Sequence, residues 1–302
     1  MAVSMKRPLI GIVGVGMVGG PFARYFEKYK GYVRGTNLFL YDTDPKKKFH
    51  DDVNRADVVF ISVPTPRNPD GSADMSRIRD AISRFADGKT IVLKSTVPPG
   101  TTEAFAGEYP EHQFLFNPEF LTEKNAWQDM LHPDRQIVGF TKKNVQAAEL
   151  VLSLLPKAKF SAPTKDQKIT ATEAEYIKYA GNIYLARKVN WANALAKATE
   201  KLGANYEHVR AGLAADVRIG KSHLDVNHHG YRGFGGYCFP KDTAAFMAFA
   251  KTNGLDDVHA LLEADWKFNE QLLAEQGFTI DEVSVHDEAL LKKLQTKKKK
   301  RL

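Results

Sequence analysis

The stretch LIGIVGVGMVGG, residues 9–20, decides the fold. Its first half is a short apolar run typical of a buried strand, and its second half fits G-x-G-x-x-G. A strand that runs through this pattern into a helical segment is the context in which the pattern binds a dinucleotide. The first glycine permits a tight turn, the second lets backbone approach a pyrophosphate, and the third lets helix and strand pack closely. We predict that the dinucleotide contacts Gly14, Gly16, Met17, Val18 and Gly19.

A secretory leader is a second interpretation of this amino terminus, because basic residues precede the apolar run. The run is only about seven residues long and ends in glycines rather than in a small-residue cleavage site, so we interpret it as a buried first strand. No apolar run approaches the roughly 18 to 20 residues of a membrane-spanning helix. One cysteine in 302 residues cannot form an internal disulfide, which is typical of a reducing compartment. We expect a cytoplasmic protein with no membrane partner.

The net charge of +7 is concentrated at the carboxyl terminus. Residues 292–301 contain seven basic side chains and no acidic one, while the rest of the chain carries equal numbers of basic and acidic residues. A like-charge run of this kind is usually solvated, so we predict a disordered tail and no nucleic-acid partner. The overall composition, 43% hydrophobic and 26% charged, is that of a globular protein.

Short apolar runs alternate with segments of helical pattern from Leu9 to Phe140. The runs lack polar alternation, as strands covered on both faces do. This order predicts an α/β fold with a Rossmann-type doubly wound parallel sheet. The expected strands are LIGIVGV (9–15), NLFLYD (37–42), ADVVFISVP (56–64), KTIVLKS (89–95), HQFLFN (112–117) and RQIVGF (135–140), and the expected helices span 19–30, 74–86, 101–108 and 143–155.

The pattern changes at about Gln167, where a long helical segment rich in alanine begins and continues to Leu202. Further helices are expected at 205–214, 242–252 and 256–276, with a glycine-rich loop between the first two. A mostly helical domain with a long connecting helix therefore follows the sheet. The predicted domains are 1–166 (dinucleotide-binding), 167–276 (helical) and 277–302 (a carboxyl-terminal extension that includes the basic tail).

Asp42 ends the second predicted strand, 23 residues after the last glycine of the fingerprint. A carboxylate in this position hydrogen-bonds the hydroxyls of the adenine ribose and repels a 2′-phosphate. The cofactor is therefore predicted to be NAD rather than NADP, although the three lysines at 46–48 weaken that preference.

Five further segments resemble, in order, the UDP-glucose/GDP-mannose dehydrogenase family. They are VPTPRNPDGSADMS (63–76), KSTVPPGTT (94–102), NPEFLTEKNAWQDMLHPDRQIVG (117–139), EAEYIKYAGNIYLARKVNWANALA (173–196) and YRGFGGYCFPKD (231–242). The resemblance covers about 9–269. It implies an NAD-dependent enzyme that oxidises the C6 alcohol of a nucleotide sugar to a carboxylate in two steps, and a homodimer formed through the long helix.

The resemblance makes Cys238 the catalytic nucleophile. A thiolate can add to the intermediate aldehyde, and the resulting thiohemiacetal can lose a second hydride to become a thioester, which water hydrolyses. Asp242, four residues later, is implied in proton transfer; if Pro240 begins the next helix, Asp242 lies in its first turn. Lys178 and Asn182 are spaced i, i+4 and are implied to stabilise negative charge that develops on oxygen.

The resemblance places one of the two glutamates, Glu119 and Glu123, near the hydrolytic water and the other nearer the nicotinamide or the sugar, and it implies that Thr96 positions the water. Which glutamate is the general base stays open. The two glutamates share a face if a helical turn follows Pro118. Implied cofactor contacts beyond the fingerprint are Asp42, Pro64, Thr65, Ser95, Thr96 and Glu123. Implied substrate contacts are Glu119, Phe120, Lys178, Asn182, Arg218, Gly235 and Lys241. His228 and His229 lack partners at ligand spacing, so no metal site is expected.

Two features depart from the family. The span between Asp42 and Asp57 is shorter than usual, and residues 277–302 show no βαβ pattern, so the third, nucleotide-binding domain of the family is expected to be absent. Three functions therefore stay open: a minimal nucleotide-sugar dehydrogenase, a two-domain dehydrogenase of the β-hydroxyacid type acting on a smaller substrate, and an inactive NAD-binding or partner-binding remnant. The sugar and the role of the tail also stay open.

Overall fold

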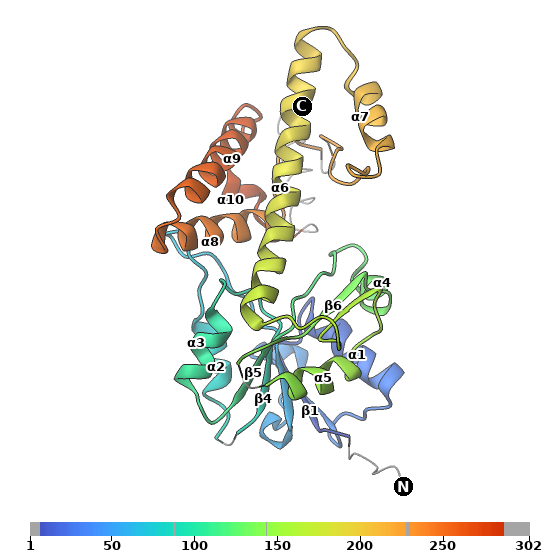
Figure 1. The fold of residues 1–302 in the computed structure, drawn as a ribbon, viewed down its shortest axis with the longest axis vertical. Helices are drawn as coiled ribbons and strands as arrows, with labels where there is room; N and C mark the ends of the chain where they lie inside the picture. The colour runs from blue at the N-terminus through green and yellow to red at the C-terminus, as the bar shows by residue number, and fades with distance from the viewer. Residues whose placement is uncertain (1–6, 87, 143, 228–229, 287–302) are drawn as a thin grey trace. The chain divides into compact units, whose positions relative to one another are not determined.

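The computed structural model describes residues 7–86, 88–142, 144–227 and 230–286. Contacts divide the chain into two compact units. The first comprises residues up to Pro66 together with Ala73–Lys178, and the second comprises Arg67–Ser72 and the residues from Tyr179 onward. The units therefore divide inside the long helix, whereas the predicted domain boundary precedes that helix (Figure 1).

A six-stranded sheet in the order β2-β1-β3-β4-β5-β7 forms the centre of the first unit. The strands are β1 (Ile10–Val13), β2 (Leu38–Tyr41), β3 (Val58–Ile61), β4 (Thr90–Leu93), β5 (Gln113–Phe116) and β7 (Gly139–Phe140). The first five are parallel. The chain runs outward from β1 to β2 and then returns to place β3 on the other side of β1. This reversal creates the crevice at the carboxyl ends of the strands where α/β sheets bind ligands.

The sixth predicted strand, RQIVGF, was wrong as a single parallel strand. It divides at Val138, whose N–H bonds to Ala162. Its first part, β6 (Arg135–Ile137), pairs with β8 (Phe160–Ala162) in a separate two-stranded sheet, and its second part, β7, pairs antiparallel with β5. The main sheet is therefore mixed, and the other five strands confirm the parallel prediction.

Helices cover both faces of the sheet. On β3, Val58 and Phe60 pack with one helix layer, and Val59 and Ile61 pack with the other. One layer contains α1 (Gly19–Lys30), α4 (Ala126–Leu131) and α5 (Val145–Leu154), and the other contains α2 (Ser76–Ile82) and α3 (Thr101–Glu108). The predicted doubly wound architecture is confirmed. Two short 3₁₀ turns, Pro45–Lys47 and Val53–Arg55, connect β2 to β3.

The second unit is helical, as predicted. Its helices are the distal part of α6 (Ala171–Lys201), α7 (Tyr206–Ala215), α8 (Cys238–Thr252), α9 (Asp256–Ala274) and α10 (Ile280–Val283). Within this unit, α8, α9 and α10 lie on one side of α6 and α7 lies on the other (Figure 1).

Two predicted helix starts were wrong. The long helix begins at Ala171 rather than near Gln167, because Thr170 and Glu173 bond each other's backbone N–H groups as a capping box. Helix α8 begins at Cys238, four residues before the predicted start, with Pro240 as its third residue. Proline is tolerated there because the first N–H groups of a helix have no intrahelical partner. Neither α4 nor α10 was predicted.

Candidate active site

The glycine turn fits a dinucleotide for a different reason at each glycine. Gly14 has φ of 88°, and a Cβ on it would lie 2.8 Å from the backbone of Ser62 at the end of β3. A Cβ on Gly19 would overlap the carbonyl oxygen of Gly14. A Cβ on Gly16 would meet no atom within 4 Å. The first and third glycines are therefore required by the turn itself, and the second presents open backbone at the amino end of α1, where a pyrophosphate fits.

Asp42 anchors the same turn. Its carboxylate accepts hydrogen bonds from the backbone N–H of Val15 at 2.8 Å and of Asp44 at 2.9 Å, and it pairs with Lys47 at 2.8 Å. Burial alone would raise the pKa of Asp42, but Lys47 and the two N–H donors outweigh burial and hold the pKa below its ordinary value. The predicted ribose acceptor is therefore an ionised carboxylate, and the lysine expected nearby is paired with it.

Several predicted cofactor contacts follow β3 and β4. The Thr65 hydroxyl donates to the carbonyl oxygen of Thr96 at 2.9 Å, and Ser95 Oγ donates to the carbonyl oxygen of Val63 at 2.7 Å. Pro64 is exposed and Thr96 is half-buried. These bonds tie together the two segments at the carboxyl edge of the sheet where the contacts were predicted.

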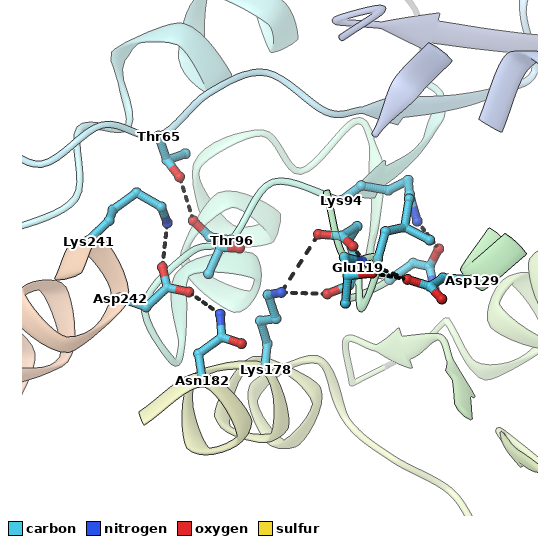
Figure 2. A network of polar contacts seen from close by, with 12 residues as sticks. Thr65, Lys94, Thr96, Glu119, Asp129, Lys178, Asn182, Lys241 and Asp242 are labelled. Atoms are coloured by element: carbon cyan, nitrogen blue, oxygen red, sulfur yellow. Dashed lines mark hydrogen bonds and ion pairs between the residues drawn. The ribbon is translucent and has the colours of Figure 1, made fainter. Parts of the chain in front are cut away.

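Glu119 follows β5 and meets Lys178 of α6 (Figure 2). The Lys178 ammonium donates to the Glu119 carbonyl oxygen at 2.5 Å and lies 3.7 Å from its carboxylate. Both side chains are buried, with the Lys178 side chain 6% exposed. Phe120, a predicted substrate contact, stacks against the Arg135 guanidinium, 3.8 Å from the ring centroid. These contacts place two of the predicted groups together in the first unit.

The predicted helical turn after Pro118 was wrong. Residues 117–122 form no helix, and α4 begins only at Ala126. The Glu119 carboxylate instead accepts a hydrogen bond from the N–H of Leu121, and Asp129 holds Thr122 through both N–H and hydroxyl. Glu119 and Glu123 therefore do not share a helix face, and Glu123 is half-buried. Buried Lys94, whose ammonium donates to Asn117 at 2.7 Å, lies in the same region and was not predicted.

Half-buried Asn182 and buried Lys241 and Asp242 form a second polar group (Figure 2). The Asn182 amide donates to the Asp242 carboxylate at 2.5 Å, and the Lys241 ammonium pairs with the other carboxylate oxygen. Burial acts to lower the pKa of Lys241, but Asp242 outweighs burial and, with Cys238, holds the pKa above its ordinary value. The expected first-turn position of Asp242 was wrong, because α8 begins at Cys238 and Asp242 lies one turn later.

Cys238 is half-buried and is the first residue of α8. A helix amino terminus and a neighbouring ammonium both favour a thiolate. The position thus matches what a covalent nucleophile requires. Gly235, predicted to contact substrate, is half-buried in the preceding loop. Buried Asn269 of α9 bonds both backbone groups of Phe234 in that loop, a contact that the sequence did not predict.

Arg218, a predicted substrate contact, lies at the surface of the second unit. Its side chain is 88% exposed and pairs with Asp216 at 2.6 Å, so within this chain it forms a surface ion pair. Its predicted substrate contact stays a prediction. His228 and His229 lie outside the described residues, and the described residues contain no group of three or more potential metal-ligating His, Cys, Asp or Glu side chains. In the same described residues, no helix is long and apolar enough to span a membrane.

The fold and the glycine turn define a dinucleotide-binding α/β protein with a helical second unit. The NAD-binding domain model of the UDP-glucose/GDP-mannose dehydrogenase family matches residues 43–154, and the central domain model matches residues 172–271. The chain belongs to the UDP-glucose/GDP-mannose dehydrogenase family, as the sequence motifs predicted, and its cofactor is NAD.

Relatives of known name agree with this assignment. The UDP-glucose 6-dehydrogenase of Rickettsia bellii is 34% identical over 234 residues, covering 74% of this chain and 51% of its own length. UDP-glucose 6-dehydrogenase YwqF of Bacillus subtilis is 38% identical over 207 residues, covering 65% of this chain and 45% of its own length. A UDP-glucose dehydrogenase structure from Pyrobaculum islandicum superposes with a TM-score of 0.74 at 28% identity, covering 91% and 72% of the two chains. The chain spans about half the length of the curated relatives.

Proposed function

We propose that this protein is an NAD-dependent nucleotide-sugar 6-dehydrogenase that oxidises a C6 alcohol to a carboxylate through a covalent bond to Cys238. The observation that carries the proposal is the position of Cys238 at the amino terminus of α8, with buried Lys241 and Asp242 and half-buried Asn182 in the same unit. A lone structural thiol has no need of a buried charged network on the next turn. A nucleophile that gains and loses a proton does.

The proposed reaction has three stages: oxidation of the alcohol, formation of a thioester and hydrolysis. The C6 hydroxyl loses a proton and C6 loses a hydride to give an aldehyde; NAD supplies the hydride acceptor. The Cys238 thiolate adds to the aldehyde carbon to give a thiohemiacetal, which becomes a thioester by losing its hydroxyl proton and a hydride, for which a second NAD would be the acceptor. Water then attacks the thioester carbon, the C–S bond breaks, and carboxylate and thiolate are released. Each sugar therefore yields two NADH.

The side chains have distinct proposed roles. Lys178 and Asn182, one turn apart on α6, stabilise negative charge that develops on the sugar oxygen. Asp242 accepts and returns a proton. Thr96 orients the hydrolytic water, with Glu119 or Glu123 as its base. Lys178 already contacts the Glu119 backbone, so Glu119 is held beside an ammonium before any ligand binds.

The assembly is part of the proposal. Tyr184 and Trp191 of α6 lie seven residues apart, which places them on one helix face, and they are 62% and 64% exposed. Large exposed aromatic side chains on one face support the predicted homodimer through α6. A reducing, cytoplasmic location fits a catalytic thiol. Light scattering that finds a monomer at micromolar concentration would rule out the dimer.

The test of function is the stoichiometry of NADH per sugar. Purified protein is incubated with NAD and a limiting amount of each of several UDP- and GDP-sugars, and NADH is followed by absorbance. We expect two NADH per molecule for one sugar class. One NADH from a small hydroxyacid would instead identify the β-hydroxyacid class, and NAD binding without turnover on any sugar or acid would identify an inactive remnant.

A further inference from the structure

The loop that precedes Cys238 is held by residues that come after the catalytic motifs in the sequence. We call residues 276–286 the C-terminal brace; it contains α10 and lies beyond the residues 172–271 that the family model matches. Its shape is specified locally, because Thr279 and Glu282 form a capping box at the start of α10. The sequence predicted only a carboxyl-terminal extension from residue 277, with no contact to the cysteine loop.

The brace contacts the loop through backbone hydrogen bonds. The Gln276 amide accepts from the N–H of Arg232 at 2.7 Å and donates to its carbonyl oxygen at 2.9 Å. The N–H of Gly236 donates to the carbonyl oxygen of Val283 at 2.8 Å. These bonds fix the loop at two points, Arg232 and Gly236, which lie six and two residues before Cys238, the first residue of α8.

Apolar packing reinforces the bonds. Ile280 and Val283 are buried in one cluster with Tyr231 and Phe234 of the loop. A Cβ on Gly235 would lie 2.9 Å from the carbonyl oxygen of Val283, so loop and brace are in direct contact there. The ring of Tyr237, immediately before the cysteine, stacks on His286 with centroids 4.5 Å apart. The brace therefore contacts the loop at its beginning, its middle and its end.

From these contacts we propose that the C-terminal brace positions the catalytic thiol: it holds residues 231–237 so that Cys238 begins α8 beside Lys241. Gln276 and Ile280 are thus positioning residues that act through the loop. Without the brace, the first turn of α8 frays, and Cys238 loses the helix terminus and the ammonium that favour its thiolate. The proposal deepens the proposed function, but its test measures the thiol directly and requires no substrate.

The experiment uses the full chain and its single cysteine. The rate of Cys238 alkylation by iodoacetamide is measured against pH for the wild type, Ile280→Asp and Gln276→Leu. Leu262→Ala is the control, since it removes a buried side chain from α9 that is not part of the Tyr231 cluster. Circular dichroism and thermal unfolding report whether each variant folds.

We expect the midpoint of the alkylation profile to move upward by about one pH unit in both brace variants. The limiting rate at high pH should rise because the loop opens. Leu262→Ala should lower the unfolding temperature and leave the midpoint unchanged. Gln276→Leu removes the side-chain hydrogen bonds to the backbone of Arg232 and Leu272 without placing a charge in the apolar cluster, so it keeps the test available if Ile280→Asp does not fold. An unchanged midpoint in folded Gln276→Leu would overturn the proposal, whether or not the protein oxidises a nucleotide sugar.

Discussion

Cys238→Ala is expected to reduce steady-state carboxylate formation by about 10³-fold or more, the scale seen when a covalent nucleophile is removed. The thiol is the group that converts the aldehyde into a species able to lose a second hydride. The first hydride transfer needs no thiol, so a single turnover should still release at most one NADH per active site. Quenched-flow product analysis with NADH absorbance measures both quantities.

The control for this variant is NAD binding. The glycine turn and Asp42 lie in the first unit, whereas Cys238 lies in the second. Cys238→Ala should therefore bind NAD with an affinity within about twofold of the wild type, because it removes one small side chain that is not part of the glycine turn and shares no contact with Asp42. If Cys238→Ala formed carboxylate at a rate near that of the wild type, the covalent mechanism would be wrong.

Gly16→Ala is expected to weaken NAD binding by about tenfold to a hundredfold while leaving the fold intact. A Cβ at this position meets no protein atom within 4 Å, so the free protein accommodates it. The same Cβ occupies space that a pyrophosphate needs, and a steric conflict of one methyl group typically costs about 1–3 kcal/mol. Calorimetric titration with NAD measures the affinity, and thermal unfolding reports the fold.

Gly20→Ala is the matched control. It lies in the same turn of sequence, and its Cβ also meets nothing within 4 Å, but it is the second residue of α1 and not part of the fingerprint. Alanine there should bind NAD normally and stabilise the helix by roughly 0.5–1 kcal/mol. Equal NAD affinity of Gly16→Ala and Gly20→Ala would contradict the assignment of Gly16 to the pyrophosphate.

The sequence predicted the parts of the molecule that depend on local pattern. The five buried strands, the glycine turn and the long helix each carry a signal within a few residues, and each was found where it was predicted, apart from the start of the long helix. One error came from applying a general rule about proline to a local sequence signal. Pro240 suggested a helix start, although proline fits equally well at the third position of a helix that begins at Cys238.

Long-range contacts account for the rest of what was missed. The split of RQIVGF depends on β8, which pairs with β6 from 20 or more residues away and has only three residues of its own. Asn269 accepts a hydrogen bond from Phe234, 35 positions away in the sequence, and Gln276 accepts one from Arg232, 44 positions away. No sequence motif indicates such pairs. The T-x-x-E signal at Thr170 could have located the start of α6, and it was overlooked.

The central claim is that the sugar becomes covalently attached to Cys238, and acid-quenched mass analysis tests it most directly. Glu119→Gln and Glu123→Gln are each mixed with NAD and the preferred nucleotide sugar, quenched, digested and analysed at the peptide containing Cys238. If one glutamate activates the hydrolytic water, its glutamine variant should accumulate a nucleotide-linked uronyl adduct on Cys238 after two NADH are released per site. Formation of carboxylate and two NADH with Cys238 unmodified throughout would contradict the account.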